Sequence, residues 1–545
     1  MKMKHFERHN SFFILLVAIL VLSSAFAIGS WFPRAMAAGE VLLEYSRLIS
    51  DVLTFVTNDY VEEVPPKELI TNAIQGMLQE LDPHSNLLTP EVAEDLSERT
   101  NGQYSGVGIE FDIHGGYLVV LQPIEDGPSE RVGIRPGDRI VKINGESAIG
   151  ITKEEVFRKL RGRKGSQVEV TVEREGIPDL LDFTITRDKI DIKSVRASFM
   201  IDDSYGYVMV SNFNRNTARD LQTAMRKLEA DGMRGLVLDL RTNPGGLMDQ
   251  AIDMVDIFIP RDRMIVYTKG RTKPANREYL SKNDNPVDYP VIVMINRYSA
   301  SASEIVAGAL QDWDRALVIG SSRSFGKGLV QSIYQLEQGY RLKLTTAFYY
   351  IPSGRSVQVP WKDEEGNNIY AERMERIHRD NDETAGEEEV EVEVEVEKKP
   401  YKTKLKKRTV YGGGGVYPDL KVEPNPRVPE WLDKVRRTML FDFVTTYIAD
   451  AGIQSVAGFD RDSGWVEALK EFIVERGETV DEEEFEKQMK MIRGLVRAEV
   501  GGHLINANER IRILRTDLDE ELLEAIKHFP EAQALIAGVR AQAGG

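Results

Sequence analysis

Residues 290–331 contain a serine and a lysine that could together carry out acyl-transfer chemistry. Three serines crowd a short polar loop, and Lys327 follows between two glycines. A serine hydroxyl is a weak nucleophile until a base removes its proton, and an uncharged lysine can act as that base. The serines are Ser299, Ser301 and Ser303. Ser301 followed by Glu304 also fits a helix capping box, so a purely structural role for this serine stays open.

Short apolar segments around these residues predict the elements that position them. Val291–Ile295 and Ala316–Ile319 are predicted to be buried strands, with a helix from about 302 to 310 between them. The first strand turns sharply into this helix. Ser301 is therefore expected at a helix N-terminus, where unpaired N–H groups favour developing negative charge.

Four motifs in a fixed order resemble the signature of the C-terminal processing (tail-specific) proteases, a family of Ser–Lys peptidases. They are DLRTNPGG (239–246), SASASEI (299–305), FGKGLVQ (325–331) and YIPSGRSVQ (350–358). The resemblance implies that Ser301 is the nucleophile, Lys327 the general base and Gln331 a supporting residue. It implies an endopeptidase that uses no cofactor and no metal ion.

The resemblance also implies roles for residues around this dyad. The N–H groups of Ala302 and of one glycine, Gly245 or Gly246, are expected to form the oxyanion hole, and the motif does not distinguish the two glycines. Three further residues are expected to support the site: Asp239, Arg241 and Glu304. A structural ion pair between the first two is an alternative that is compatible with this role.

Residues 102–190 change to short strands and glycine turns and resemble a PDZ domain. GPSERVGIRPGDRIVKINGE (127–146) is similar to the second half of that fold, and Gly106, Val107, Gly108 and Ile109 resemble its carboxylate-binding loop. Such a loop offers N–H groups to a terminal carboxylate, while the adjacent strand edge accepts the peptide as an added strand. The expected partners are protein substrates with accessible apolar C-termini. A PDZ domain kept for packing alone is the alternative, and a weaker resemblance makes Arg161 a link to the active site.

The whole chain is expected to be a multidomain α/β protein. Apolar residues at helical spacing predict helices near both ends, whereas buried strands alternate with helices in the centre. The expected order is a signal peptide or membrane anchor (1–38), a helical N-terminal region (39–101), the PDZ domain (102–190), a crotonase-like α/β protease core (191–358 and 412–427), a charged insertion (359–411) and an all-helical C-terminal domain (428–545).

The N-terminal segment indicates export. Basic residues precede an uncharged, mostly apolar run over 11–32, and Ala35-Met36-Ala37 follows at the spacing of a cleavage site. A removable signal peptide and an uncleaved anchor both fit, since the run is long enough to span a bilayer. The basic flank places the N-terminus inside and the rest outside, which predicts a periplasmic protein with N-terminal membrane contact.

Two regions are not explained by the resemblance. The insertion carries EEEVEVEVEVE (387–397) and then KKPYKTKLKKR (398–408), which fit either solvated disorder or an acid–base paired hairpin. The helices of 428–545 are interpreted as an oligomerisation or partner-binding module, with packing onto the core as the equal alternative.

Composition excludes several other functions. The net charge of −17 argues against general nucleic-acid binding, and the absence of cysteine excludes disulfides and a thiol nucleophile. The seven histidines match neither a nucleophile-elbow hydrolase nor an H-E-x-x-H zinc peptidase. A catalytically idle PDZ adaptor that binds C-terminal tails remains the alternative function, although intact Ser301, Lys327 and Gln331 argue against it.

Overall fold

The computed structural model describes residues 41, 43–361 and 398–543 and contains two compact units, Met1–Leu87 and Leu88–Gly545. In the first unit, a helix covers residues 43–59, α2 spans Pro66–Gln79, and the short strand β1 (Asn86–Leu88) begins at its end. The predicted signal or anchor segment, 1–38, lies outside the described residues. Among the residues that are described, no helix is long and apolar enough to cross a membrane.

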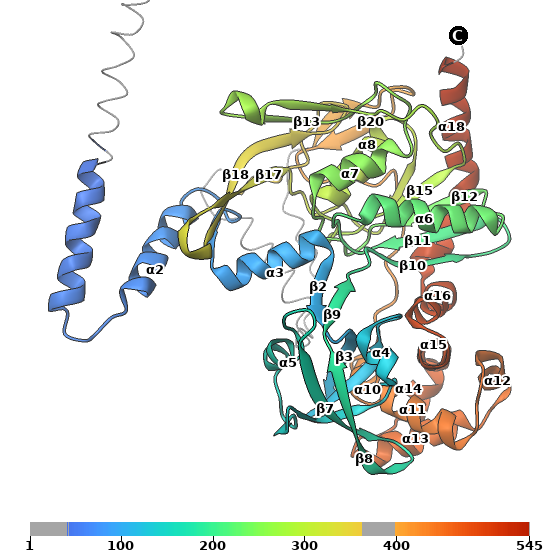
Figure 1. Ribbon diagram of the computed structural model, residues 1–545. Coiled ribbons are helices and arrows are strands. Elements are labelled where there is room, and N and C mark those ends of the chain that lie inside the picture. Colours follow the sequence, from blue (N-terminus) through green and yellow to red (C-terminus); the bar gives the residue numbers. More distant parts are fainter. Residues whose placement is uncertain (1–40, 42, 362–397, 544–545) are drawn as a thin grey trace, which may run out of the picture. The chain divides into compact units, whose positions relative to one another are not determined.

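A six-stranded sheet forms the centre of the second unit (Figure 1). Its strands, in spatial order, are β10 (Val195–Met200), β11 (Tyr205–Val210), β12 (Gly235–Asp239), β15 (Val291–Met294), β16 (Leu317–Gly320) and β21 (Leu420–Lys421). β10 is antiparallel to its neighbour, and all later pairs are parallel. The central strands are almost wholly apolar and buried, as expected for a parallel sheet that is covered on both faces.

Helices cover both faces of this sheet. On one face pack α6 (Thr217–Ala230), α7 (Met248–Asp256) and α8 (Ala302–Asp312). The other face is covered by α17 (Glu520–Ala525), η3 (Ile526–His528) and α18 (Phe529–Ala543). Phe529 stacks on Tyr205 with ring centroids 3.8 Å apart. The last helices of the chain are therefore a layer of the α/β core, not part of a separate C-terminal module.

A second, antiparallel sheet flanks the core. Its strands include β13 (Met264–Gly270), β14 (Arg277–Leu280), β17 (Leu329–Gln335) and β18 (Arg341–Tyr350), with the 3₁₀ turns η1 (Lys273–Ala275) and η2 (Glu337–Gly339). β17 and β18 form a long hairpin. Lys327 lies between β16 and β17, so this hairpin follows directly from the loop of the candidate base.

The expected PDZ region folds into a sheet of its own. In spatial order it contains β3 (Ile109–His114), β4 (Tyr117–Pro123), β5 (Arg139–Ile143), β7 (Gln167–Arg174) and β8 (Ile177–Thr186), with β6 (Glu146–Ser147) paired to β5 and the helices α4 (Pro128–Val132) and α5 (Lys153–Leu160). The chain enters from α3 (Pro90–Asn101) through β2 (Gln103–Gly106), which pairs with the exit strand β9 (Asp188–Asp191).

The other helices of the C-terminal region have their own apolar core. They are α10 (Glu430–Thr438), α11 (Leu440–Asp450), α12 (Val456–Arg461), α13 (Trp465–Glu475), α14 (Glu482–Lys487), α15 (Met489–Leu504) and α16 (Ala507–Leu518). Trp465 and Phe485 are among the most deeply buried side chains there.

The charged insertion is described only in part. Its basic block forms β19 (Lys399–Lys402), which pairs with β20 (Thr409–Gly412) in a short hairpin. The acidic block lies outside the described residues, so the acid–base hairpin stays a prediction.

Candidate active site

Ser301 occupies a strained turn between β15 and α8. Its φ of 55° lies in the left-handed region, which is unfavourable for a residue with a side chain and which clusters at functional sites. Every residue from Ser299 to Asp312 is buried except Ser301, which is half-buried. The turn thus presents one hydroxyl at the edge of a buried helix N-terminus.

The buried carboxylate of Glu304 joins the turn of Ser301 to the loop of Lys327. One oxygen, Oε2, accepts the N–H groups of both residues at 2.8 Å, and Oε1 accepts the N–H of Gly326 and the hydroxyl of Ser324. Burial raises the pKa of Glu304, and these hydrogen bonds partly offset that effect. The side chain of Glu304 therefore holds the backbones of both the candidate nucleophile and the candidate base. Its bond to the N–H of Ser301 is also one of the two bonds of the predicted capping box.

Tyr349 reinforces the same junction from β18. Its hydroxyl lies 3.1 Å from the carbonyl oxygen of Ser301 and 2.9 Å from that of Lys327, so it can donate to either. Lys327 is half-buried between buried neighbours, and the predicted supporting residue Gln331 lies half-buried in β17, where it pairs with Thr345.

The predicted oxyanion glycines lie directly against the serine turn. A Cβ on Gly245 would come within 2.9 Å of the backbone nitrogen of Ala302 and of the Cβ of Ser301, and its φ is 95°. Only glycine therefore fits at this position. Gly246 forms a parallel bridge with Phe213, which directs the N–H of Gly246 away from that residue.

Asn243 holds this glycine loop and ties it to the serine turn. Its Oδ1 accepts the N–H of Gly245 at 2.9 Å, and its backbone oxygen accepts the N–H of Ala300 and the hydroxyl of Ser303. Asn243 is fully buried. The loop that carries the glycines and the turn that carries Ser301 are thus one hydrogen-bonded unit.

Asp239 and Arg241 form the ion pair that the sequence suggested. Two further carboxylates also contact Arg241. Arg241 Nη2 donates to Asp239 Oδ2 and to Asp519 Oδ2, each at 2.6 Å, and Nη1 reaches Glu521 Oε2 at 3.2 Å. All four side chains are at most 8% exposed. The structural ion pair that the sequence analysis gave as an alternative is therefore present. Its two further carboxylates, Asp519 and Glu521, come from the start of α17.

The four predicted PDZ loop residues lie where β2 passes into β3: Gly106 ends β2, Ile109 begins β3, and Val107 and Gly108 connect them. Gly106, Val107 and Gly108 are buried, and Val107 accepts hydrogen bonds from the N–H and hydroxyl of Ser129. β3 is the terminal strand of its sheet and faces α5, where Phe111 meets Phe157 edge-on at 5.4 Å.

Arg161, at the C-terminal end of α5, does not contact Ser301 or Lys327 in any recorded interaction of the described residues. Instead it pairs with Glu98 and Asp95 of α3 and stacks on Tyr104 and Phe157. Its contacts join the PDZ domain to the helix that precedes it.

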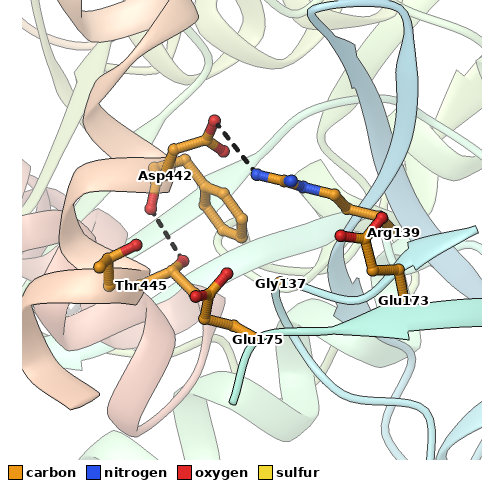
Figure 2. A pocket seen from close by; sticks show the side chains of 8 residues that line it. Gly137, Arg139, Glu173, Glu175, Asp442 and Thr445 are labelled. Atoms are coloured by element: carbon orange, nitrogen blue, oxygen red, sulfur yellow. Dashed lines mark hydrogen bonds and ion pairs between the residues drawn. The ribbon is translucent and has the colours of Figure 1, made fainter. Parts of the chain in front are cut away.

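A small cavity of about 20 Å³ lies between the PDZ sheet and α11 (Figure 2). Figure 2 shows Arg139 of β5 directed toward Asp442, with a separation of 3.9 Å between Nη2 and Oδ2. Asp442 also lies 3.7 Å from His114 and 3.4 Å from Arg476. Burial raises the pKa of Asp442, but the neighbouring side chains of His114, Arg139 and Arg476 outweigh it and the net pKa is lowered. Asp442 thus links the PDZ domain to the helical region.

Comparison with known proteins identifies the family. Residues 204–361 match the model of peptidase family S41. The chain is 42% identical over 313 residues to the carboxy-terminal-processing protease of Bartonella bacilliformis, covering 56% of this chain and 71% of that one. The chain belongs to peptidase family S41. Its homologues are named as carboxy-terminal processing proteases, as the four motifs predicted.

Further matches cover other parts of this S41 peptidase. Residues 119–174 match the PDZ domain model, within the predicted 102–190. A probable CtpA-like serine protease of Staphylococcus saprophyticus is 33% identical, over 65% of this chain and 72% of its own. The solved photosystem II D1 C-terminal processing protease is 32% identical with a TM-score of 0.33, over 56% of this chain and 82% of that chain.

Sequence reasoning missed four residues that hold the candidate site. Asn243 stood within a quoted motif, and its position before Pro-Gly marked only a turn. Tyr349 immediately precedes another motif. Asp519 and Glu521 begin a helix more than 200 residues away from the serine turn, where an acidic first turn is ordinary helix capping and signals nothing more.

Proposed function

We propose that this S41 peptidase is a serine endopeptidase with a Ser301–Lys327 dyad that recognises protein C-termini through its PDZ domain and cleaves the chain nearby. The observation that carries this proposal is the shared carboxylate of Glu304, which brings the backbones of Ser301 and Lys327 to a single oxygen atom. Both residues are also the half-buried members of otherwise buried segments.

In the proposed reaction, Ser301 Oγ attacks the carbonyl carbon of the scissile bond while Lys327 Nζ takes the hydroxyl proton. The C–N bond then breaks, Lys327 returns the proton to the leaving amine, and water hydrolyses the acyl-enzyme. A lysine in water has a pKa of about 10.4, so about one in 2,500 is neutral at pH 7. The reaction therefore needs a site that disfavours the ammonium form, as burial does.

The structure favours one of the two candidate glycines as oxyanion donor. The N–H of Gly245 already donates to Asn243, whereas that of Gly246 is directed away from its bridge partner. We therefore assign the oxyanion hole to the N–H groups of Gly246 and Ala302, with Gly245 providing the close approach of the two segments.

The PDZ domain is proposed to bind the substrate's C-terminus. β3 is a terminal strand, so a peptide can pair with it as an added strand, and the aromatic rings of Phe111 and Phe157 suit an apolar last residue. The loop over 106–109 would receive the carboxylate.

The protein is further proposed to act in the periplasm, exported or anchored by its N-terminal apolar segment. The support is the charge and hydropathy pattern of residues 1–38. Carbonate extraction of membranes from cells that express the full chain separates an anchored form from a released one. Self-association through the helices of 428–518 is a second proposal, which sedimentation of the full chain tests.

Cleavage of an unstructured protein with an apolar C-terminus tests the enzymatic proposal. The full chain should cleave it, while Ser301→Ala and Lys327→Arg should be inactive but still bind the tail. Arginine keeps the charge but cannot deprotonate, so it separates base catalysis from a charge that only orients the loop. Substantial proteolysis by Lys327→Arg would contradict the dyad.

Two further outcomes test the recognition step. Amidation of the substrate's terminal carboxylate should weaken both binding and cleavage; equal values for both substrates would exclude carboxylate recognition. Tail binding without any cleavage by the wild-type chain would instead support the idle PDZ adaptor.

A further inference from the structure

The guanidinium of Arg241 is held from its outer side by the start of α17. Nη1 and Nη2 donate to the two oxygens of Asp519 at 3.0 and 2.6 Å, a bidentate geometry. Glu521 adds a third contact at 3.2 Å. Asp519 precedes α17 and Arg241 follows β12, so the contact joins residues that are 278 positions apart in the chain.

The cluster around Arg241 is buried and places three carboxylates around two guanidinium groups. Asp239 lies within hydrogen-bonding distance on one side, and Asp519 also accepts from Arg515 at 2.6 Å. Burial raises the pKa of Asp519, but Arg241 and Arg515 outweigh it and the net pKa is lowered. The pKa of Arg241 is raised well above its usual value, because its acidic neighbours outweigh its own burial. A buried guanidinium that loses a partner is left uncompensated, so each carboxylate has a large effect on where Arg241 sits.

Arg241 lies near the start of the loop that carries the oxyanion glycines, two residues after the end of β12. The next residue, Thr242, has a φ of 58°, a strained conformation for a β-branched residue. Such strain persists only where surrounding contacts over-determine the backbone. One such contact is the hydrogen bond from the N–H of Thr242 to Asn296 Oδ1 at 2.9 Å. Another is the anchorage of the preceding side chain, Arg241, in its carboxylate cluster.

We infer that Asp519 is a positioning residue for catalysis: by fixing Arg241 it holds the strained loop 241–246 in the geometry that aims the Gly246 N–H at the developing oxyanion. The inference rests on the proposed function of this loop. It makes the C-terminal helices a working part of the active site, since without them Arg241 loses its outer partners.

Asp519→Asn in the full chain tests this inference. The amide keeps the size of the carboxylate, and its oxygen can still cap α17 through the N–H of Leu522. The nitrogen that replaces Oδ2 faces the donors of Arg241 and Arg515 and cannot accept from them. An oxyanion donor acts only in the transition state, so kcat should fall with little change in KM.

The expected loss in kcat is about 10-fold, less than the roughly 10²–10³-fold that follows removal of an oxyanion donor. Affinity for a peptide boronic acid, which mimics the tetrahedral intermediate, should fall by the same factor. Affinity for an unreactive tail peptide should not change. If the role of Asp519 were merely structural, Asp519→Asn would change neither the affinity for the boronic acid nor the ratio of kcat to KM.

Asn508→Ala is the matched control. It removes another hydrogen bond from the C-terminal region to the sheet, from the N–H of Ser198 to Asn508 Oδ1 at 2.8 Å, and touches no member of the cluster. Its kcat should equal that of the wild type. Equal losses in the two variants would overturn the inference, because they would reflect general destabilisation.

Failure of the inference and failure of the proposed function give different results. If Ser301→Ala cleaves as fast as the wild type, the proposed function fails and the inference with it. If cleavage depends on Ser301 but Asp519→Asn keeps the wild-type kcat, the inference alone is wrong. Should Asp519→Asn not fold, Glu521→Gln removes the weaker contact to Arg241, and an unchanged kcat and boronic acid affinity in that variant would likewise overturn it.

Discussion

The carboxylate of Glu304 accepts the backbone N–H of Lys327 at 2.8 Å, although 23 residues separate them. The intervening chain is most of α8 and the whole of β16. Because the same oxygen accepts the N–H of Ser301, the geometry of the proposed dyad depends on one fully buried side chain. The proposed nucleophile and base are thereby positioned through their backbone N–H groups.

Glu304→Gln should therefore lower activity more than its small change in shape suggests. The amide nitrogen has no lone pair to offer, so some of the four donors lose their acceptor. Each buried group left without a partner costs about 1–3 kcal/mol. We expect a lower thermal midpoint and at least a roughly 10-fold loss of cleavage, measured by calorimetry and peptide hydrolysis.

Ser324→Ala serves as the comparison for Glu304→Gln, because it removes one of the four donors and leaves the carboxylate intact. It should have the smaller effect on both measurements. A Glu304→Gln variant as active as the wild type would show that the shared carboxylate does not position the dyad.

Tyr349→Phe should destabilise the junction between the serine turn and the lysine loop. The variant removes the hydroxyl that lies between the carbonyls of Ser301 and Lys327, at a cost of about 1–2 kcal/mol for the lost hydrogen bond. We expect slower cleavage together with a lower midpoint of urea unfolding. Tyr350→Phe, next in the chain and stacked on Tyr267, should leave cleavage unchanged. Equal rates for the two variants would argue against a role for Tyr349.

Part of the stability that the protein loses below pH 4 should come from Asp519. Its folded-state pKa lies below the ordinary value of 3.8, so its ionised form stabilises the fold above that pH and this contribution is lost as the pH falls. Asp519→Asn should therefore be less stable than the wild type at pH 7, and the difference in thermal midpoint should narrow from pH 4 downward. For Asn508→Ala, the difference in thermal midpoint from the wild type should not change over this pH range. A constant gap for Asp519→Asn would contradict the lowered pKa.

Asp442→Asn should loosen the contact between the PDZ domain and α11. Asparagine cannot balance the charges of Arg139 and Arg476, which face this carboxylate together with His114. We expect faster amide exchange at residues 137–139 and 441–446, measured by mass spectrometry. Asp433→Asn breaks ion pairs that lie within α10 and should not change exchange at these sites. Unchanged exchange in Asp442→Asn would mean that apolar packing alone holds the two parts together.

Local patterns sufficed for the elements around the proposed dyad. The apolar run predicted over Val291–Ile295 is β15, and the helix predicted from 302 is α8. Both were predictable because neighbouring residues alone specify a strand buried on both faces and a helix cap. The glycine turns of the PDZ region are local in the same sense. The order of the four motifs was enough to predict the family.

Tertiary structure alone decided how the C-terminal region is divided. Helical periodicity predicted helices after 428, but it carries no information on which surface each apolar face covers. The structure places α17 and α18 against the central sheet, whereas α10–α16 enclose a core of their own. The last helices therefore pack onto the α/β core, which was one of the two alternatives for 428–545, and helix content alone could not separate them from α10–α16.

The sequence by itself determined the chemistry available to this protein: a serine at a strand–helix turn, a lysine between glycines and a pair of glycines after a buried strand. Only the tertiary structure decided how these residues are held, through Glu304, Asn243, Tyr349 and Asp519. The physical reason is that a turn or an apolar strand is specified by neighbouring residues, whereas these hydrogen bonds and ion pairs join distant segments and exist only once both sides are buried together.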